Sequence, residues 1–593
     1  MLSKIIIAVS LFLFAVPPSV YSAATLKIKA TLDPDLNTVY GSIVIHIPEN
    51  FSEHTYELYL PANKFSPGDF EYMESFPGMD KSGFYASITI DSVLLNGADI
   101  TDRFAVSRTH GTLNCENIQV AGQKLYLRFK THLPQYGTSL LATNGEFFLG
   151  GWFPVPATLR SGESINQGCN HFVDPVGDYY FYDIEFSAPS NLVVVASVQS
   201  IDMVVQNGFK TYNFNFGPAV DFAIALSSSY VVDSTIQSGI ALKYFCRDFE
   251  KELAIDIKNI TSFAFSFMND YVGPYTYPEL NFAFINAARP VALEYPGLIA
   301  LFSPRGGALA SNYYEYLAIR TVVHQWFYAM IAADRCTEPW LNESIAEYFA
   351  LKIADKYWGR DANLIDFGGF KATFSDDLRL NARVTEGKAP VNLSAGQLTS
   401  EIEYGTTIRN RGALTVATIF NLLGDSLTSV FWKSYYESHL LNRTSTDSFL
   451  SLLEEVAGAG AKRQAGYLLN SAERIDYSVS ALSYRPIDSV TYESRFVLSR
   501  SGTLSIPVAY KIIFYNDDTL SFIWDASRYS ELIRFESKYP ARTVIIDPDF
   551  LIAVDFNLFN NSIQVAGDSR PAWRLSSGIM FLIESIISLI GGW

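Results

Sequence analysis

A histidine and two glutamates in one short stretch have the types and spacing of a metal centre. His324 is followed nineteen positions later by Glu343, and Glu347 comes one helical turn after Glu343. An imidazole and carboxylates are donors that zinc accepts, and a zinc ion with an open coordination position lowers the pKa of its bound water to about 7. This pattern is therefore typical of hydrolysis assisted by a metal ion.

Two further groups that this chemistry needs are replaced. In zinc peptidases of the HExxH type, two histidines four positions apart reach one metal ion from the same helix face, and the glutamate beside the first histidine is the general base. Here Arg320 stands four positions before His324, and Thr321 stands at the place of that glutamate. An arginine keeps its charge and cannot ligate zinc. The chemistry that the spacing suggests is therefore incomplete.

The sequence around these residues resembles the M1 (gluzincin) family of aminopeptidases. The letters HQWF at 324–327 and WLNESIAEY at 340–348 match the family's two signature segments without insertion or deletion between them. GPYTYP at 273–278 and VALEYPGL at 291–298 resemble the segments that precede them. The resemblance covers about residues 26–561 and is closest to bacterial members with a short C-terminal β domain.

The resemblance implies roles for single residues. Glu294, with Ala292 nearby, matches the position that holds the free amine of a peptide substrate. His324 and Glu343 match two of the three metal ligands, and Arg320 replaces the first. The site is thus expected to keep part of its substrate contacts and to have only a vestigial metal centre.

Two catalytic positions are changed as well. Thr321 takes the place of the general base, and Arg409, in the stretch RNRGA at 409–413, takes the place of the family's transition-state tyrosine. Loss of one oxyanion donor commonly costs about 10²–10³ in rate. We therefore expect a pseudoenzyme without a resident cofactor. Its retained cleft would bind a peptide or protein ligand.

An ion pair is expected where the family has its metal ion. Arg320 lies on the same helix face as His324, and its guanidinium is expected to pair with Glu343. Without a metal or another positive partner, a buried carboxylate at position 343 would be costly. Arg409 is expected to add positive potential to the same cleft.

Two other functions stay open. The first is an active but divergent zinc aminopeptidase, in which His324, Glu343 and Glu347 converge on one ion. The second is a structural envelope protein whose cleft is filled by side chains. Bound zinc together with chelator-sensitive hydrolysis would favour the first of these two.

The pattern along the chain predicts a multi-domain α+β protein. Apolar residues make up 49% and aromatic residues 15% of the 593 residues, which is ample for several folded cores. Strands are predicted at 222–232 and elsewhere before residue 240, and long helices at 250–271, 313–332, 341–357 and 413–423. With the family resemblance, the expected parts are a signal peptide (1–22), an N-terminal β-sandwich-like domain (23–235), a thermolysin-like, mainly helical peptidase domain (236–475), a small C-terminal β domain (476–565) and a hydrophobic tail (566–593).

Charge and targeting patterns bear on location and partners. The formal net charge of −17 and the absence of a basic run argue against nucleic-acid binding. The apolar run at 5–15 predicts a cleaved export signal, hence a periplasmic, cell-envelope or extracellular protein. The tail is expected to be a packed helix, a membrane-associated helix or a lipid-anchor signal. Four cysteines, at 115, 169, 246 and 336, leave three full disulfide pairings open.

Overall fold

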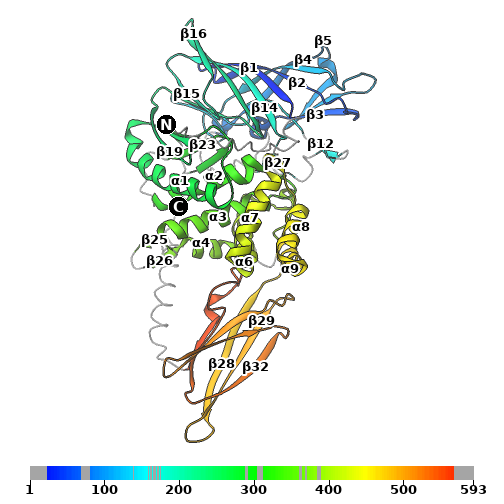
Figure 1. Cartoon of the computed structure of the whole chain (residues 1–593). Helices are drawn as coiled ribbons and strands as arrows, with labels where there is room; N and C mark the ends of the chain where they lie inside the picture. Colours follow the sequence, from blue (N-terminus) through cyan, green and yellow to red (C-terminus); the bar gives the residue numbers. More distant parts are fainter. Residues whose placement is uncertain are drawn as a thin grey trace, which may run out of the picture. The chain divides into compact units, whose positions relative to one another are not determined.

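The computed structural model describes residues 23–67, 81–137, 139–157, 159–160, 163–164, 177–286, 291–303, 311–359, 363–367, 370–383 and 389–565, with residues 169, 173 and 175. The predicted signal peptide and hydrophobic tail lie outside these residues. The chain divides into two compact units, the first ending at Asn470 and the second beginning at Ser471. The mixed α+β fold predicted from the sequence is confirmed, with a β-rich region followed by a helical one (Figure 1).

A large sheet begins the first unit. Its first strand, β1 (Thr25–Asp33), alternates buried and exposed residues along its length, because one face packs on the core and the other faces solvent. The neighbouring strands are joined in the order β16 (Asp202–Gln206), β17 (Phe209–Ala219), β14 (Tyr180–Pro189), β1, β2 (Thr38–His46), β8 (Lys124–His132), β4 (Ser87–Leu95) and β5 (Ala98–Asp99).

Two four-stranded sheets and one short strand pair, β12 (Leu159–Arg160) with β13 (Glu163–Ser164), complete the β-rich region. Trp152, which is fully buried, contributes to its core, and the Trp152 indole donates to the Phe222 carbonyl at 3.3 Å. One sheet joins β15 (Val193–Ala196), β18 (Ile224–Ser227), β10 (Glu146–Leu149) and β9 (Leu140–Thr143). The other joins β11 (Val155–Pro156), β3 (Thr55–Tyr59), β7 (His110–Asn114) and β6 (Phe104–Ser107).

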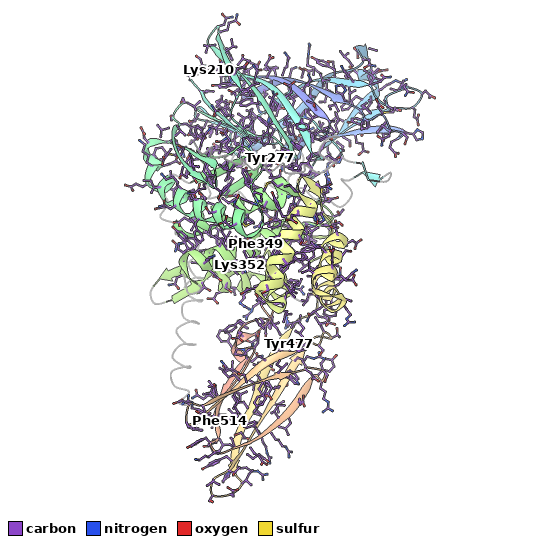
Figure 2. All side chains as sticks on the ribbon, viewed as in Figure 1. Lys210, Tyr277, Phe349, Lys352, Tyr477 and Phe514 are labelled. Atoms are coloured by element: carbon purple, nitrogen blue, oxygen red, sulfur yellow. A yellow bond between two sulfur atoms is a disulfide. The ribbon has the colours of Figure 1, made fainter. Side chains whose placement is uncertain are left out.

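A five-stranded sheet, a set of helices and short strand pairs, among them β25 (Asn363–Phe367) with β26 (Phe370–Thr373), form the rest of the first unit. The sheet order is β19 (Val231–Gln237), β20 (Ile240–Cys246), β21 (Glu279–Asn286), β23 (Leu298–Ser303) and β22 (Val291–Tyr295). The helices are α1 (Lys251–Tyr271), α2 (Ser311–His324), α3 (Trp340–Trp358), α4 (Phe374–Ala382), α5 (Glu401–Tyr404), α6 (Gly412–Leu423), α7 (Asp425–His439), α8 (Thr446–Ala457) and α9 (Ala459–Asn470). In Figure 2, Phe349 lies among these helices, where its ring stacks on Phe327 at 5.3 Å.

Two predicted elements differ from the structure. The helix expected at 313–332 stops being α-helical after His324; a π-helical segment runs to Met330, with non-helical backbone angles at Phe327, and β24 (Ile331–Ala332) follows. The reason is that β24 pairs with β27 (Asn442–Arg443), which draws the backbone out of the helix. The strand expected at 222–232 is two strands, β18 and β19, separated by a turn. The expected domain boundary at 235/236 falls inside β19.

The second unit contains two antiparallel sheets around an apolar core. Tyr477 and Phe514, both labelled in Figure 2, belong to that core and are buried. One sheet joins β28 (Asp476–Pro486), β29 (Tyr492–Ser501) and β32 (Ser530–Ser537). The other joins β31 (Thr519–Trp524), β30 (Val508–Phe514), β33 (Ala541–Ile546) and β34 (Ser562–Gln564).

Among the described helices, none is by itself both long and apolar enough to cross a bilayer. One sharply bent pair, Glu401–Leu423 followed by Asp425–His439 at 119°, meets the requirements of length and composition when taken together.

One of the three cysteine pairings left open by the sequence includes the bond that the structure forms. Cys169 is linked to Cys336 across 167 positions of the chain, while Cys115 and Cys246 are free and buried. The bond fastens the segment just before α3 to a distant part of the first unit. Closing such a long loop restricts the unfolded chain strongly, which stabilises the folded state.

We expect the double substitution Cys169→Ser, Cys336→Ser to lower the free energy of unfolding by about 2–5 kcal/mol, because the loop-closure constraint is lost. Thermal or denaturant unfolding measures this. Reductant should destabilise the natural protein and leave the double variant unchanged. Equal sensitivity of both proteins to reductant would show that this disulfide does not carry the effect.

Candidate functional site

The candidate site forms where the end of α2, the start of α3 and the edge strand β22 come together. Gln325, fully buried, fastens this arrangement: its amide donates to the Tyr295 carbonyl at 3.0 Å and accepts from the Gly297 amide at 3.1 Å. These two bonds hold the β22–β23 hairpin against the end of α2. As a result His324 on α2 and Glu294 on β22 face the same space.

Glu343 is the centre of the site. Its side chain is 4% exposed, and guanidinium nitrogens of three arginines lie around it: Arg335 Nη2 at 2.9 Å, Arg409 Nε at 3.5 Å and Arg320 Nη1 at 3.7 Å. Burial alone would raise the pKa of Glu343, but these positive charges hold its pKa well below the ordinary value. The carboxylate is therefore ionised at neutral pH.

The ion pair predicted between Arg320 and Glu343 is present, but it is the longest of the three contacts. Arg335, which the sequence reasoning missed, makes the shortest. The guanidinium of Arg335 also lies 3.4 Å from Glu294 Oε1 and 5.2 Å from the ring centre of Tyr328. Arg335 therefore bridges the two carboxylates that the family resemblance assigns to metal binding and to substrate binding.

The backbone on either side of Arg335 is fixed by hydrogen bonds and by a disulfide. Asp334 accepts the backbone amides of Cys336 and Thr337 at 2.9 and 3.2 Å, and Cys336 forms the disulfide with Cys169. These contacts fix the backbone next to Arg335. The signal that could have revealed this arginine was its place in the linker between the two signature segments, beside a cysteine.

Arg409 is positioned by a close approach of α3 and α6. It lies on a π-helical segment, Gly405–Arg411, that leads into α6. The Ser344 hydroxyl donates to the Ile408 carbonyl at 2.6 Å, and a Cβ added at Gly412 would clash with the side chain of Ser344. The side chain of Arg409 is 36% exposed, the most of the three arginines.

The other positions singled out in the sequence lie near this centre and are buried. Glu347 accepts a hydrogen bond from the Tyr316 hydroxyl at 2.6 Å. Thr321 donates to the Ala318 carbonyl at 2.9 Å, inside its own helix, so its hydroxyl is engaged away from the carboxylates. Ala292, on β22, is 3% exposed.

A buried phenol close to these charges was also missed. Tyr404 lies five positions before Arg409, in α5, and interacts electrostatically with Glu343, Arg335 and Glu294. Burial raises its pKa well above the ordinary value, so the phenol keeps its proton at neutral pH.

His324 keeps the features of a metal-binding histidine. It is 1% exposed, and its Nδ1 lies 3.3 Å from the Phe327 carbonyl, which can only accept. Nδ1 is therefore the donor, and Nε2 of the neutral ring carries the lone pair. Burial lowers the pKa of His324, which favours this neutral form. Ligand atoms of Glu294, His324 and Glu343 all lie within 4.8 Å of one another.

This trio was not the one expected, because the sequence suggested Glu347 as the third donor. One imidazole and two carboxylates are a donor set that zinc accepts. However, Arg335 already pairs with both carboxylates, and Arg320 and Arg409 place two more positive charges beside Glu343. A divalent cation would be repelled by these guanidiniums. The residues present therefore do not suit a zinc ion at this position.

Comparisons with known proteins agree with the sequence resemblance. Residues 257–466 match the Peptidase family M1 domain. A glutamyl aminopeptidase of Bitis rhinoceros is 25% identical over 314 residues, which cover 48% of this chain and 32% of the relative. An aminopeptidase N of Lactococcus lactis strain IL1403 is 23% identical over 325 residues, covering 49% and 37%. The chain spans about a third of the length of these relatives.

Solved structures share the fold. An M1 zinc metallopeptidase from Deinococcus radiodurans is 15% identical with a TM-score of 0.54, and the match covers 76% of this chain and 94% of that one. Aminopeptidase A of Legionella pneumophila, solved with aspartic acid, is 10% identical with a TM-score of 0.64 and covers 90% and 59%. Residues 257–466 thus match the M1 domain, and the likeness to these structures shows that the fold is shared.

Proposed function

We propose that this chain is an exported M1-type protein that does not hydrolyse peptides. The observation that carries the proposal is the Glu343 carboxylate, which has three guanidinium groups within 3.7 Å where the family's zinc ligand would need a metal ion. The expected export signal and the Cys169–Cys336 disulfide support a location outside the cytosol, because such bonds persist in oxidising compartments.

The proposed loss of activity has three independent causes. Arg320 takes the place of a zinc ligand, Thr321 offers no carboxylate as general base, and Arg409 offers a permanent cation where the family has a phenol. A base and an oxyanion donor each contribute factors of about 10²–10⁴ to enzymatic rates. Restoring one group would therefore leave the other two losses in place.

A second candidate function is a divergent zinc aminopeptidase. It is favoured by the close approach of Glu294, His324 and Glu343, whose ligand atoms lie within 4.8 Å of one another. For this function Arg335 would have to withdraw from both carboxylates. The guanidinium contacts oppose it, and we therefore place it second.

A peptide or protein ligand is proposed for the M1 site, and membrane association is proposed for the apolar tail at 566–593. Arginine side chains occupy the catalytic position, and this occupation supports a purely structural role in the cell envelope. A ligand-binding measurement separates these roles, as described below.

We expect the natural protein to show no chelator-sensitive hydrolysis of aminoacyl fluorogenic substrates. The triple variant Arg320→His, Thr321→Glu, Arg409→Tyr restores the family's motif, but Arg335 would still pair with both carboxylates. Activity should therefore appear only when Arg335→Met is added as a fourth change. Initial rates with and without chelator measure this.

The control is the same set of changes without Thr321→Glu, which lacks the general base. This variant should bind zinc and hydrolyse at least about a hundredfold more slowly than the fourfold variant. Chelator-sensitive turnover by the natural protein would contradict the proposal. Full activity of the triple variant would contradict the role given to Arg335.

A second prediction concerns stability. Glu343→Gln should lower the free energy of unfolding by about 3 kcal/mol at pH 7, because three partly buried guanidiniums lose their shared anion. The matched control is Glu454→Gln, whose partner Lys462 is 41% exposed; such surface pairs contribute about 0–1 kcal/mol. Arg320→Ala should also be destabilising. Denaturant unfolding measures all three variants.

The stabilisation that Glu343 gives to the folded protein depends on pH in a defined direction. The pKa of Glu343 is lowered in the folded state, so its contribution is fully present above the unfolded value near 4.5 and is lost as the pH falls below it. The difference in stability between the natural protein and Glu343→Gln should shrink below pH 4.5. A chelator should change neither protein, whereas a chelator-induced loss of stability in the natural protein would show a metal at this position.

A further inference from the structure

We propose that the M1 site of this protein binds a ligand through a carboxylate group, with Arg409 as the first contact and Arg335 and Arg320 behind it. The inference rests on the proposed function, because it takes the three guanidiniums as the permanent cations of the site. It reverses the charge preference that the family resemblance implies, in which a glutamate holds the ammonium group of a peptide.

The first observation is the order of exposure. The side chains of Arg409, Arg335 and Arg320 are 36%, 19% and 11% exposed, whereas those of Glu294 and Glu343 are 9% and 4% exposed. Arg409 is therefore the charged side chain of the cluster that solvent reaches most, and Glu343 is the one that it reaches least. A charged ligand approaching from solvent meets guanidinium before it meets carboxylate.

The second observation is that the carboxylates are already engaged. Glu294 accepts from Arg335 at 3.4 Å, and Glu343 has contacts with all three arginines. A third carboxylate, that of Glu347, accepts from Tyr316 and belongs to a residue that is 3% exposed. To bind at Glu294, an ammonium group would have to displace a guanidinium from it, and like charges would oppose its approach.

The third observation concerns hydrogen-bond donors that lack acceptors. Within the described residues, the Nε–H groups of Arg320 and Arg335 are buried and have no hydrogen-bond partner. Leaving a buried donor unsatisfied costs about 1–3 kcal/mol, so an acceptor brought close to these groups would recover free energy. The oxygens of a carboxylate are suitable acceptors, and the planar guanidinium matches them in a two-pronged contact.

The exposure of the Arg409 side chain and the anchoring of its backbone suit this residue to make the first contact with a ligand. Its closest contact with Glu343 is made by Nε, at 3.5 Å, and its side chain is 36% exposed. The segment that carries it is anchored through the Ser344–Ile408 hydrogen bond. The fixed backbone limits the ordering needed when a ligand binds.

The test compares three short peptides by calorimetric titration at low ionic strength. The first, acetyl-Ala-Ala-Asp with a free C-terminus, has carboxylates and no amine. The second, acetyl-Ala-Ala-Asn-amide, has the same size and no charge. The third, Ala-Ala-Ala-amide with a free N-terminus, has only an ammonium group. We expect binding of the first peptide alone, weakened at least about tenfold by Arg409→Gln and less strongly by Arg409→Lys, which keeps the charge but not the two-pronged contact.

The control variant is Arg528→Gln, which removes an exposed arginine from the second unit and should leave binding unchanged. Preferential binding of the ammonium peptide, or carboxylate binding that Arg409→Gln does not weaken, would overturn the inference. Absence of binding by all three peptides would also overturn it while leaving the proposed lack of hydrolysis intact. Hydrolysis of the ammonium peptide would instead contradict the proposed function.

Discussion

A buried carboxylate must have a positive partner, and the Glu343 site is built around that constraint. The family resemblance implies that a metal ion meets this requirement in M1 peptidases. Here Arg335, Arg409 and Arg320 meet it at 2.9, 3.5 and 3.7 Å. Removing any one partner of such a cluster leaves uncompensated charge in a region of low dielectric. The three arginines therefore act together on Glu343. Replacing one of them changes the electrostatic environment of the others.

The remainder of the M1 domain holds that cluster in place with neutral contacts. Gln325 ties the β22–β23 hairpin to the end of α2, the Ser344–Ile408 bond ties α3 to the segment of Arg409, and the disulfide fixes the loop of Arg335. The scaffold that would orient a metal centre thus orients arginines instead. Because the framework is kept, replacing a few charges could change what the site binds without altering the fold.

Much of this could be read from the sequence, since it depends on spacing along the chain. The match at 324–348 fixed the relation of His324 to Glu343 and exposed the replacements at 320 and 321, and Arg409 followed from its neighbours. Arg335 is in the linker between the two signature segments, but that place alone does not give its role, which depends on how a loop folds back over two carboxylates from different elements. The disulfide partner was inaccessible for the same reason. The end of α2 was misplaced because β24 pairs with β27, a contact between residues far apart in the chain.

We propose that guanidiniums, and not a metal ion, neutralise Glu343 in this protein. The most direct measurement is the zinc content of the natural full-length protein, purified without chelator, dialysed against zinc and then analysed by native mass spectrometry. We expect the folded chain to carry no zinc and its mass spectrum to be unchanged by the dialysis. One tightly held zinc ion per chain, lost when His324 is replaced by alanine, would contradict it.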